Sequence, residues 1–391
     1  MLKIVEIKNQ AKWDDFIDST GGHPLQSWGW GELKKEHHWD VKRIFIRSTT
    51  KKYAEYKKSD NRDVVAAAQI LTRKLPWPLN NFAYIPRGAH ILSKKPAERA
   101  KMMREITDYC AKNIKPKPVC LSIEPDWNDF PPQLLKEQGW KTAKNTILLP
   151  KTILIDLKKS DEELFKEMSK KTRQYIRKSS DEISVRPIEH DIDFEECLKI
   201  YEETAARAGF NIHSRQYYQD LRRILGDNAP VYGAYAPAIE PEQNGEQSEQ
   251  VETDIDIEIK GTLGKPSSEQ VDLERIYGSK LARKQELVAF LWPIKSGKIA
   301  FELYGGVTER GQETRANYIL KWLTIKQMQS AGVGQYDVNG LLNDGISNFK
   351  RGFAKHEDTF CGTYDKPLSP LYFVWAHLLP LGKRIIRKFK L

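Results

Sequence analysis

Residues 152–178, TILIDLKKSDEELFKEMSKKTRQYIRK, predict a strand followed by a helix that continues into a basic run, and this order sets the fold class. The apolar run at 152–157 reads as a strand. Ser160 is a good helix N-cap, and three acidic residues follow it where the first helical turn favours negative charge. The helix leads directly into a basic run at 169–178. A strand that feeds helices in this way is typical of a mixed α/β unit.

The segments on either side repeat this alternation. Before the quoted stretch, strands are predicted at 3–7, 41–46, 64–72, 82–86 and 119–124, and helices at 14–19, 28–36 and 95–112. After it, helices are predicted at 194–208, 216–225 and 318–331, and strands at 231–236, 287–291, 298–304 and 335–338, with a turn at Gly305-Gly306. We therefore predict an α/β (α+β) fold of two successive units, each with a mixed sheet flanked by helices.

Charge is spread unevenly along the 391 residues. The formal net charge is +10, yet residues 238–258 hold eight acidic residues and no Lys or Arg, so the rest of the chain carries +18. We interpret 237–284 as an acidic, flexible insertion in a hairpin, because it is too polar to bury a core. The basic remainder fits a polyanion, such as nucleic acid, anionic lipid or a phosphorylated small molecule, and equally a basic protein with no such partner.

The cysteines and the termini point to the cytoplasm. Cys110, Cys120, Cys197 and Cys361 are scattered without a CxxC pair, which predicts reduced thiols. We expect a cytoplasmic protein, since the first residues lack the apolar stretch of a signal peptide. Residues 368–381, with Trp375 and the cations that follow, form an amphipathic basic tail. Such a tail fits the membrane surface, or a helix that packs its apolar side on the protein body.

Common catalytic motifs are absent from the sequence. It contains no GxSxG, HExxH, Walker loop or GxGxxG that opens a helix after a strand, and we expect neither a metal nor a cofactor. This favours an enzyme that positions two substrates and stabilises charge over one with an activated nucleophile.

Several segments are candidates for substrate contact. Lys170, Arg173 and Arg177 share one helix face at spacings of three and four, which suits a polyanion or a solvated surface. Two Trp residues stand just before Lys34 and suit a nucleotide or sugar-phosphate ligand, or anchor a helix in the core. Aromatic, acidic and basic residues recur at the ends of later strands, in Tyr304-Gly305-Gly306, Asp337-Val338-Asn339-Gly340 and Phe349-Lys350-Arg351-Gly352-Phe353.

In this order, the segments resemble the Fem-type (FemABX) peptidyltransferases over nearly the whole chain. The resemblance rests on Gln26-Ser27-x-x-Trp30 before Lys34, Tyr84-Ile85-Pro86-Arg87-Gly88, Lys170 to Lys178, Tyr201 to Tyr218, Leu303 to Gly306, and Tyr336-Asp337 leading to Phe349-Lys350-x-Gly352-Phe353. It implies two tandem GNAT-like domains, a first at 1–150 plus 364–391 that binds the precursor and a second at 151–363. It also implies an aminoacyltransferase that moves an amino acid from aminoacyl-tRNA to the stem-peptide amine of a peptidoglycan precursor, either UDP-MurNAc-pentapeptide or lipid II.

The resemblance also assigns roles to residues. Lys34 is expected to contact the diphosphate or sugar, with Tyr217 and Tyr304 holding the precursor. Phe349 and Lys350 are expected at the reaction centre, with Lys350 stabilising charge. His213 stands where the family pattern has Arg, so Arg215 is the second candidate for that phosphate contact.

The same resemblance suggests how the larger partners bind. The candidate tRNA contacts are the basic residues of the run, Lys170, Lys171, Arg173, Arg177 and Lys178. Peripheral contact with the inner membrane surface is a further expectation. The alternatives are a GNAT-type N-acyltransferase that uses acyl-CoA, and a non-catalytic basic protein that binds RNA or a membrane surface. The Gly-rich segment at 305–311 matches an acyl-CoA pyrophosphate loop poorly.

Overall fold

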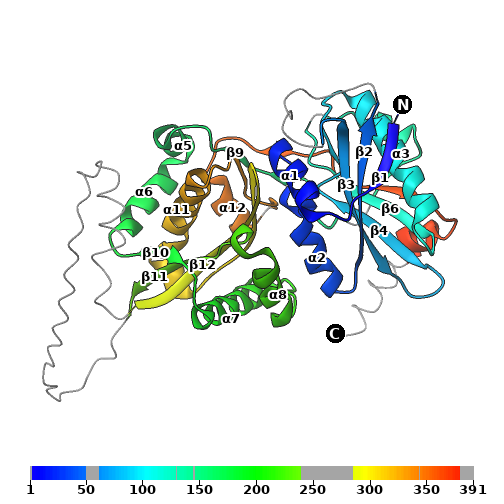
Figure 1. Ribbon diagram of the computed structural model, residues 1–391. Coiled ribbons are helices and arrows are strands. Elements are labelled where there is room, and N and C mark those ends of the chain that lie inside the picture. Colours follow the sequence, from blue (N-terminus) through cyan, green and yellow to red (C-terminus); the bar gives the residue numbers. More distant parts are fainter. Residues whose placement is uncertain are drawn as a thin grey trace, which may run out of the picture.

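Two mixed sheets with helices between and around them make up the fold (Figure 1). The computed structural model describes residues 2–49, 61–128, 130–143, 146–238, 285–342 and 344–378. Helices α1 (Gln10–Thr20) and α2 (Trp28–Glu36) lie between the two sheets. The α/β class predicted from the sequence, with mixed sheets flanked by helices, is confirmed.

The first sheet has the order β1-β2-β3-β4-β6-β16-β7, with β5 beside β3, and only β4 and β6 pair in parallel. Its strands are β1 (Leu2–Glu6), β2 (Asp40–Ser48), β3 (Val64–Lys74), β4 (Asn81–Pro86), β5 (His90–Ile91), β6 (Pro118–Glu124), β7 (Lys141–Thr142) and β16 (Tyr364–Pro367). Helices α3 (Pro96–Asn113) and α4 (Gln133–Lys136) belong to the same unit.

Strand alternation decides what covers each face of this sheet. On β2, Ile44 and Ile46 point to the core under α3, whereas Phe45 between them points to α1. There the Phe45 ring stacks on Trp13 at 5.3 Å between centroids. Because successive side chains of a strand point to opposite faces, one apolar run supplies both layers.

The second sheet has the order β10-β11-β12-β13-β14-β9. Its strands are β9 (Leu154–Asp156), β10 (Ser184–Pro187), β11 (Tyr232–Pro237), β12 (Gln285–Ser296), β13 (Ile299–Val307) and β14 (Gln335–Asp337). The helices around it are α5 (Asp161–Glu167), α6 (Lys170–Ser180), α7 (Asp191–Ala208), α8 (Arg215–Leu225), α10 (Glu309–Glu313), α11 (Ala316–Ser330) and α12 (Gly345–Arg351). A separate pair joins β8 (Lys151–Thr152) to β15 (Asp358–Thr359).

The N-terminal cap of one helix is the predicted one, whereas the cap of another places the start of the helix earlier than predicted. Ser160 caps α5 in a full capping box with Glu163. Helix α1 begins at Gln10, before the predicted start at 14, because the Asn9 side chain accepts a hydrogen bond from the Lys12 amide at 2.9 Å.

The predicted turn at Gly305-Gly306 is wrong, since both residues lie within β13 opposite Leu291 and Phe290 of β12. A Cβ on Gly306 would stand 2.8 Å from the Phe290 ring and 3.1 Å from Ile200 of α7. The glycines are needed here because α7 packs closely on the strand, and no reversal of the chain occurs.

The acidic insertion predicted at 237–284 lies outside the described residues from 239 onward. The strands on either side of it, β11 and β12, pair antiparallel from Tyr232↔Leu291 to Pro237↔Gln285. At the other end of the chain, β16 pairs with β6 of the first sheet, and Trp375 stacks on Phe82 of β4 at 4.8 Å. This aromatic of the tail therefore packs on the protein body. No helix in the described ranges is long and apolar enough to cross a bilayer.

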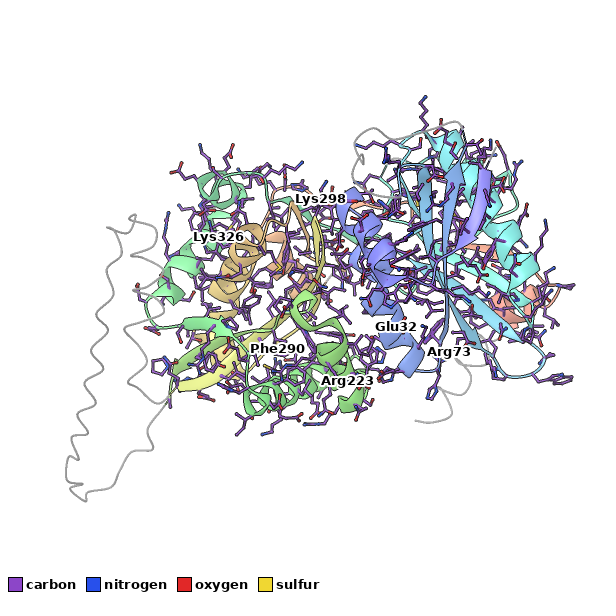
Figure 2. All side chains as sticks on the ribbon, viewed as in Figure 1. Glu32, Arg73, Arg223, Phe290, Lys298 and Lys326 are labelled. Atoms are coloured by element: carbon purple, nitrogen blue, oxygen red, sulfur yellow. The ribbon has the colours of Figure 1, made fainter. Side chains whose placement is uncertain are left out.

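One hydrophobic core runs across both units at α2 and α8. Trp30 and Leu33 of α2 are buried in the same cluster as Tyr217 and Leu221 of α8. At its rim, Arg223 of α8 meets Glu36 of α2 at 2.6 Å, and Arg223 is labelled in Figure 2. We call this contact between α2 and α8 the seam. Its apolar packing holds the two units in a defined orientation.

Candidate active site at the seam

Lys34 enters the seam from the last turn of α2. Its Nζ donates a hydrogen bond to the Tyr217 hydroxyl at 2.9 Å and lies 4.4 Å from the centre of the Trp30 ring. Trp30 and Lys34 are four residues apart and share a helix face. The sequence left open whether this Trp anchors the helix or accompanies the Lys, and its ring does both.

Tyr217, His213 and Tyr304 complete what we call the lysine–tyrosine cluster, together with Lys34. The imidazole of His213 stacks on the Tyr217 ring with centroids 4.0 Å apart, and the Tyr304 hydroxyl hydrogen-bonds to that of Tyr217. Residues from three widely separated parts of the sequence thus meet in one place. Tyr201 and Tyr218 pack behind Tyr304, with centroids 5.5 and 5.1 Å from its ring.

A β-bulge directs Tyr304 into this cluster. Trp292 of β12 pairs with Tyr304, but the next residue, Pro293, pairs with Glu302, so Leu303 is an extra residue on β13. Glu302 points to α11, whereas Tyr304 points to α8. Without the bulge, the two side chains would share one face of the sheet.

The electrostatics of the cluster favour an anionic ligand. Burial, and then the positive charge of Arg73, lower the pKa of Lys34 from 10.5 to about 8. Burial also lowers the pKa of His213, with Lys34 and His37 adding to the effect. Lys34 has no carboxylate partner in the described part of the chain. A phosphate that entered the cluster would supply the missing counter-charge.

Arg215 does not join the cluster. Its guanidinium makes ion pairs with Glu195 and Glu202, each at 2.8 Å, on the exposed side of α8. Arg215 and Tyr217 are two residues apart on a helix and therefore point in nearly opposite directions. Of the two predicted phosphate contacts, the structure brings only His213 next to Lys34.

Phe349 and Lys350 lie on α12, on the far side of the second sheet. The Lys350 ammonium donates to the Asn339 carbonyl and lies 3.4 Å from that of Gly340. Both residues have positive φ, of 54° and 63°, in the turn after β14. The turn thus directs two carbonyl oxygens at Lys350. Among the described residues, no carboxylate accepts a hydrogen bond from its ammonium.

The Phe349 ring lies in a cluster with a buried ion pair beneath it. It contacts Tyr318 and Phe353 edge-on, with centroids 4.9 and 5.3 Å apart. Lys321 of α11 lies 5.1 Å from the Phe349 centroid and pairs with Glu302 at 2.8 Å. Burial lowers the pKa of Lys321 to about 8 against the pull of Glu302. Lys321 is not among the residues predicted from the sequence, because a lysine within an apolar helix gives no motif.

A second buried charged group lies near Lys350. Asp337 accepts hydrogen bonds from the Thr152 hydroxyl and, at 2.8 Å, from the Asn339 amide, and its second carboxylate oxygen is unpartnered. Burial raises the pKa of Asp337, opposed by the charges of Arg87 and Lys350. Burial also raises the pKa of Asp126 to about 6, against Arg87. The segments that contain Arg87 and Asp337 are recognisable in the sequence as motifs. Asp126 lies in no such motif, so the sequence does not predict its place here.

The basic run forms α6, beside α12. Lys170, Lys171, Arg177 and Lys178 are exposed, whereas Arg173 turns back and donates to the Met168 carbonyl at 2.6 Å. Ser169, the cap of α6, donates its amide to the Gly352 carbonyl at 2.9 Å. A Cβ on Gly352 would come within 2.2 Å of the Thr172 hydroxyl, so this close approach requires glycine. The exposed basic surface is therefore tied directly to the end of α12.

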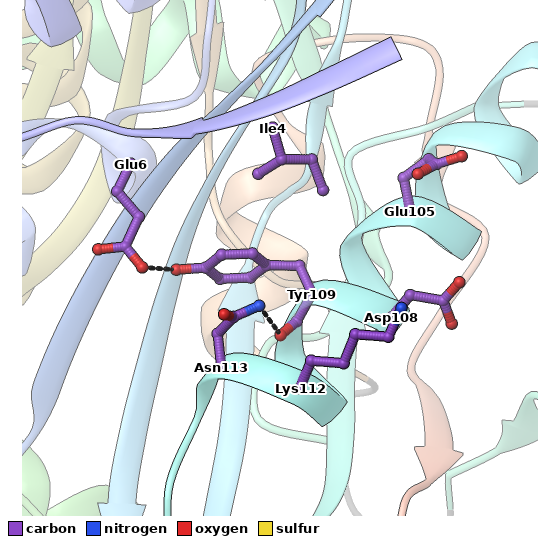
Figure 3. Close-up of a pocket in the computed structure, with 7 residues that line it drawn as sticks. All are labelled: Ile4, Glu6, Glu105, Asp108, Tyr109, Lys112 and Asn113. Atoms are coloured by element: carbon purple, nitrogen blue, oxygen red, sulfur yellow. Dashed lines mark hydrogen bonds between the residues drawn. The ribbon is translucent and has the colours of Figure 1, made fainter. Parts of the chain in front are cut away.

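A pocket on the first unit lies apart from both groups of residues (Figure 3). It opens between β1 and α3 and is lined by the carboxylates Glu6, Glu105 and Asp108. The Tyr109 hydroxyl donates to Glu6, which satisfies that carboxylate inside the protein. Its acidic lining suits neither a diphosphate nor tRNA.

The fold and the seam define a class of protein: a two-sheet α/β protein with a half-buried lysine that has no acidic partner among the described residues on one side of the second sheet, and a Phe–Lys pair beside a basic helix on the other. The chain belongs to the FemAB family, whose model matches residues 136–380.

Two relatives extend the match to the whole chain. A lipid II:glycine glycyltransferase of Staphylococcus haemolyticus (strain JCSC1435) is 22% identical over 437 residues, covering 100% of both chains. The crystal structure of FemX superposes with a TM-score of 0.71 and 18% identity, over 95% of this chain and 99% of that one. The second similarity supports the fold.

Proposed function

We propose that this protein is an aminoacyltransferase that moves an amino acid from aminoacyl-tRNA to the stem-peptide amine of a peptidoglycan precursor and so builds an interpeptide bridge. The observation that carries the proposal is the lysine–tyrosine cluster of a FemAB family member, in which a half-buried cation lacks a counter-ion. The relative from S. haemolyticus is named for lipid II and glycine. Lipid II is therefore the first acceptor to test, and glycine the first amino acid to transfer.

In this proposal the precursor diphosphate binds at the lysine–tyrosine cluster. Lys34 donates to a phosphate oxygen as it now donates to Tyr217. The imidazole of His213 lies against Tyr217 and supplies the second contact in place of Arg215, which is paired with Glu195 on the other side of α8. Tyr304 holds Tyr217 in position through their hydrogen bond.

The transfer itself needs no covalent enzyme intermediate. The acceptor amine attacks the ester carbonyl carbon, a C–N bond forms, and the carbonyl oxygen becomes an oxyanion. The intermediate then breaks its C–O bond to the tRNA ribose, and the proton lost by the amine passes to that ribose oxygen. Lys350, held by the Asn339 and Gly340 carbonyls, is the charge stabiliser for the oxyanion, with Phe349 beside it.

We assign tRNA contact to α6 because its four exposed cations stand next to α12. Arg173 contributes to the structure of the helix instead. We assign precursor binding to the first unit, 1–150 with 364–391, completed at the seam by His213, Tyr217 and Tyr304 of the second, and the tRNA end to the rest of 151–363. The proposed location is the cytoplasm, with peripheral contact at the inner membrane surface.

A four-way assay tests the proposal. Purified protein is mixed with glycyl-tRNA or with acetyl-CoA, and with UDP-MurNAc-pentapeptide or lipid II, and the products are weighed by mass spectrometry. We expect a gain of glycine on a precursor from glycyl-tRNA alone. Transfer from acetyl-CoA would replace this function by that of an acyl-CoA N-acyltransferase. Binding of both substrates without transfer would make the protein a non-catalytic binding protein. Arg351, which pairs with Glu357 at 2.6 Å, is the matched control for Lys350.

A further inference from the structure

Three segments meet at the end of the first sheet where β4 and β6 begin. The Asn81 side chain of β4 donates to the Pro116 carbonyl at 2.7 Å, which ties the β3–β4 turn to the α3–β6 loop. The amides of Leu368 and Ser369 both donate to the Val119 carbonyl, at 3.1 and 3.2 Å, and bring in the C-terminal segment. Figure 1 shows the β3–β4 turn and the red C-terminal segment at this same end.

The β3–β4 turn is built to present Trp77. The Leu75 amide donates to the Asn80 carbonyl at 2.7 Å, and the Leu79 amide to Pro76 at 3.0 Å, so the turn is closed by its own backbone. Leu75 and Leu79 point inward to the core beneath the turn, yet the Trp77 side chain between them is 92% exposed. A folded turn that leaves its largest apolar residue in water indicates a surface that meets something else.

The C-terminal segment repeats this division of inward and outward residues. Tyr372 and Trp375 pack on the core below, whereas Phe373 is 61% and Leu378 49% exposed. Of the eight exposed large apolar side chains in the described part of the chain, three lie at this end, and Trp77 is the most exposed of the eight. Scattered exposed apolar residues are ordinary, but a cluster on one face is not.

The charged residues of the three segments have one sign. Residues 71–82, 112–119 and 366–378 contain no Asp or Glu, and Arg73, Lys74, Lys115 and Lys117 are exposed. We call the surface made by these four cations with Trp77, Phe373 and Leu378 the basic–apolar face. Lys112 is left out, because it lines the acidic pocket of Figure 3.

The face adjoins the candidate precursor site. Arg73 lies 5.8 Å from the centre of the Trp39 ring, and the Trp39 amide donates to the Lys34 carbonyl at 3.1 Å. A ligand held at Lys34 therefore lies close to the face, since the charge of Arg73 acts on the Lys34 ammonium. This position suits an acceptor whose phosphates lie at the level of lipid headgroups.

We propose that the basic–apolar face docks on an anionic lipid bilayer, with its aromatic and aliphatic tips entering the headgroup region and its cations against the lipid phosphates. Trp at an interface and Lys and Arg near anionic headgroups are the residue types that membranes select. The inference deepens the proposed membrane contact by naming its surface, and it stands independently of transferase activity.

Vesicle co-sedimentation of the full chain tests the face without any substrate. Binding to vesicles of phosphatidylglycerol and phosphatidylcholine is compared with binding to phosphatidylcholine alone. We expect binding only to the anionic vesicles, roughly 30-fold weaker for Lys115→Gln/Lys117→Gln and roughly tenfold or more weaker for Trp77→Ala. The matched controls are Lys94→Gln/Lys95→Gln, at the opposite end of α3, and Ile192→Ala, an apolar side chain 81% exposed on α7. Both should bind as the wild type does.

Three results would overturn the inference. One is equal binding to both kinds of vesicle. Another is a loss in the control variants as large as that in the face variants. The third is weaker binding of uncharged tRNA by Lys115→Gln/Lys117→Gln with vesicle binding unchanged, which would make the face a nucleic-acid surface. If vesicles bind as expected while the four-way assay fails, the face stands and the proposed activity falls.

Discussion

Replacing Lys34 by Met should make the protein more stable and less able to bind its precursor. The pKa of Lys34 in the folded protein is about 8, below its ordinary 10.5. The difference corresponds to roughly 3 kcal/mol of cost for keeping the ammonium charged. Loss of the hydrogen bond to Tyr217 destabilises the variant by about 1 kcal/mol, which offsets part of this gain. Because Met preserves the length of the side chain, we expect a net gain of about 2 kcal/mol in the free energy of unfolding at pH 7.

The pH dependence gives the sign of this effect. A folded-state pKa below the unfolded value means that the folded protein binds the proton less well. The cost is therefore present in full below about pH 8 and disappears as the pH rises toward 10.5. Lys34→Met should melt at a higher temperature than wild type at pH 7, and at nearly the same temperature at pH 10.

Differential scanning fluorimetry at the two pH values measures the stability, and titration calorimetry with UDP-MurNAc-pentapeptide measures the affinity. The affinity should fall by about 10- to 100-fold, the usual range for a lost charged hydrogen bond. Lys35→Met is the control, since Lys35 is exposed and paired with Glu32 at 2.8 Å. A lower melting temperature for Lys34→Met at pH 7, or unchanged precursor affinity, would refute the idea of an uncompensated cation kept for ligand binding.

Three further predictions concern the second unit. Lys350→Met should lower kcat by about 100-fold or more with precursor affinity unchanged, as expected for an oxyanion stabiliser. The control Arg351→Met should change neither kcat nor precursor affinity. An equal loss of kcat and affinity in Lys350→Met would contradict this role. Lys170→Glu/Lys178→Glu should raise the KM for aminoacyl-tRNA and flatten its dependence on salt, and an unchanged salt slope would remove α6 from the tRNA site. Gly306→Ala should cost about 1–3 kcal/mol through crowding against β12 and α7, measured by thermal melting, whereas Gly345→Ala, with open space around it, should cost far less.

Local signals were sufficient for the elements and for part of the site. Ser160 with its acidic first turn predicts the start of α5, and the helix that follows is predicted to lead into the basic run that forms α6. These features depend on neighbours within one or two turns, so the sequence alone carries them. Helical spacing also excludes Arg215 from the site of Tyr217, because a helix directs residues two apart to opposite sides.

Tertiary structure decided which residues meet. The bulge at Leu303 turns Tyr304 toward α8, and only the pairing of β12 with β13 reveals it. Gly305 and Gly306 read as a turn in the sequence but are strand residues, because the space they leave is filled by side chains far away in the chain. The charge environment of Lys34 likewise depends on burial and on Arg73 across the fold. Hydrogen-bond patterns and helical spacing are local and can be predicted, whereas burial and register arise only when the sheets and helices pack together.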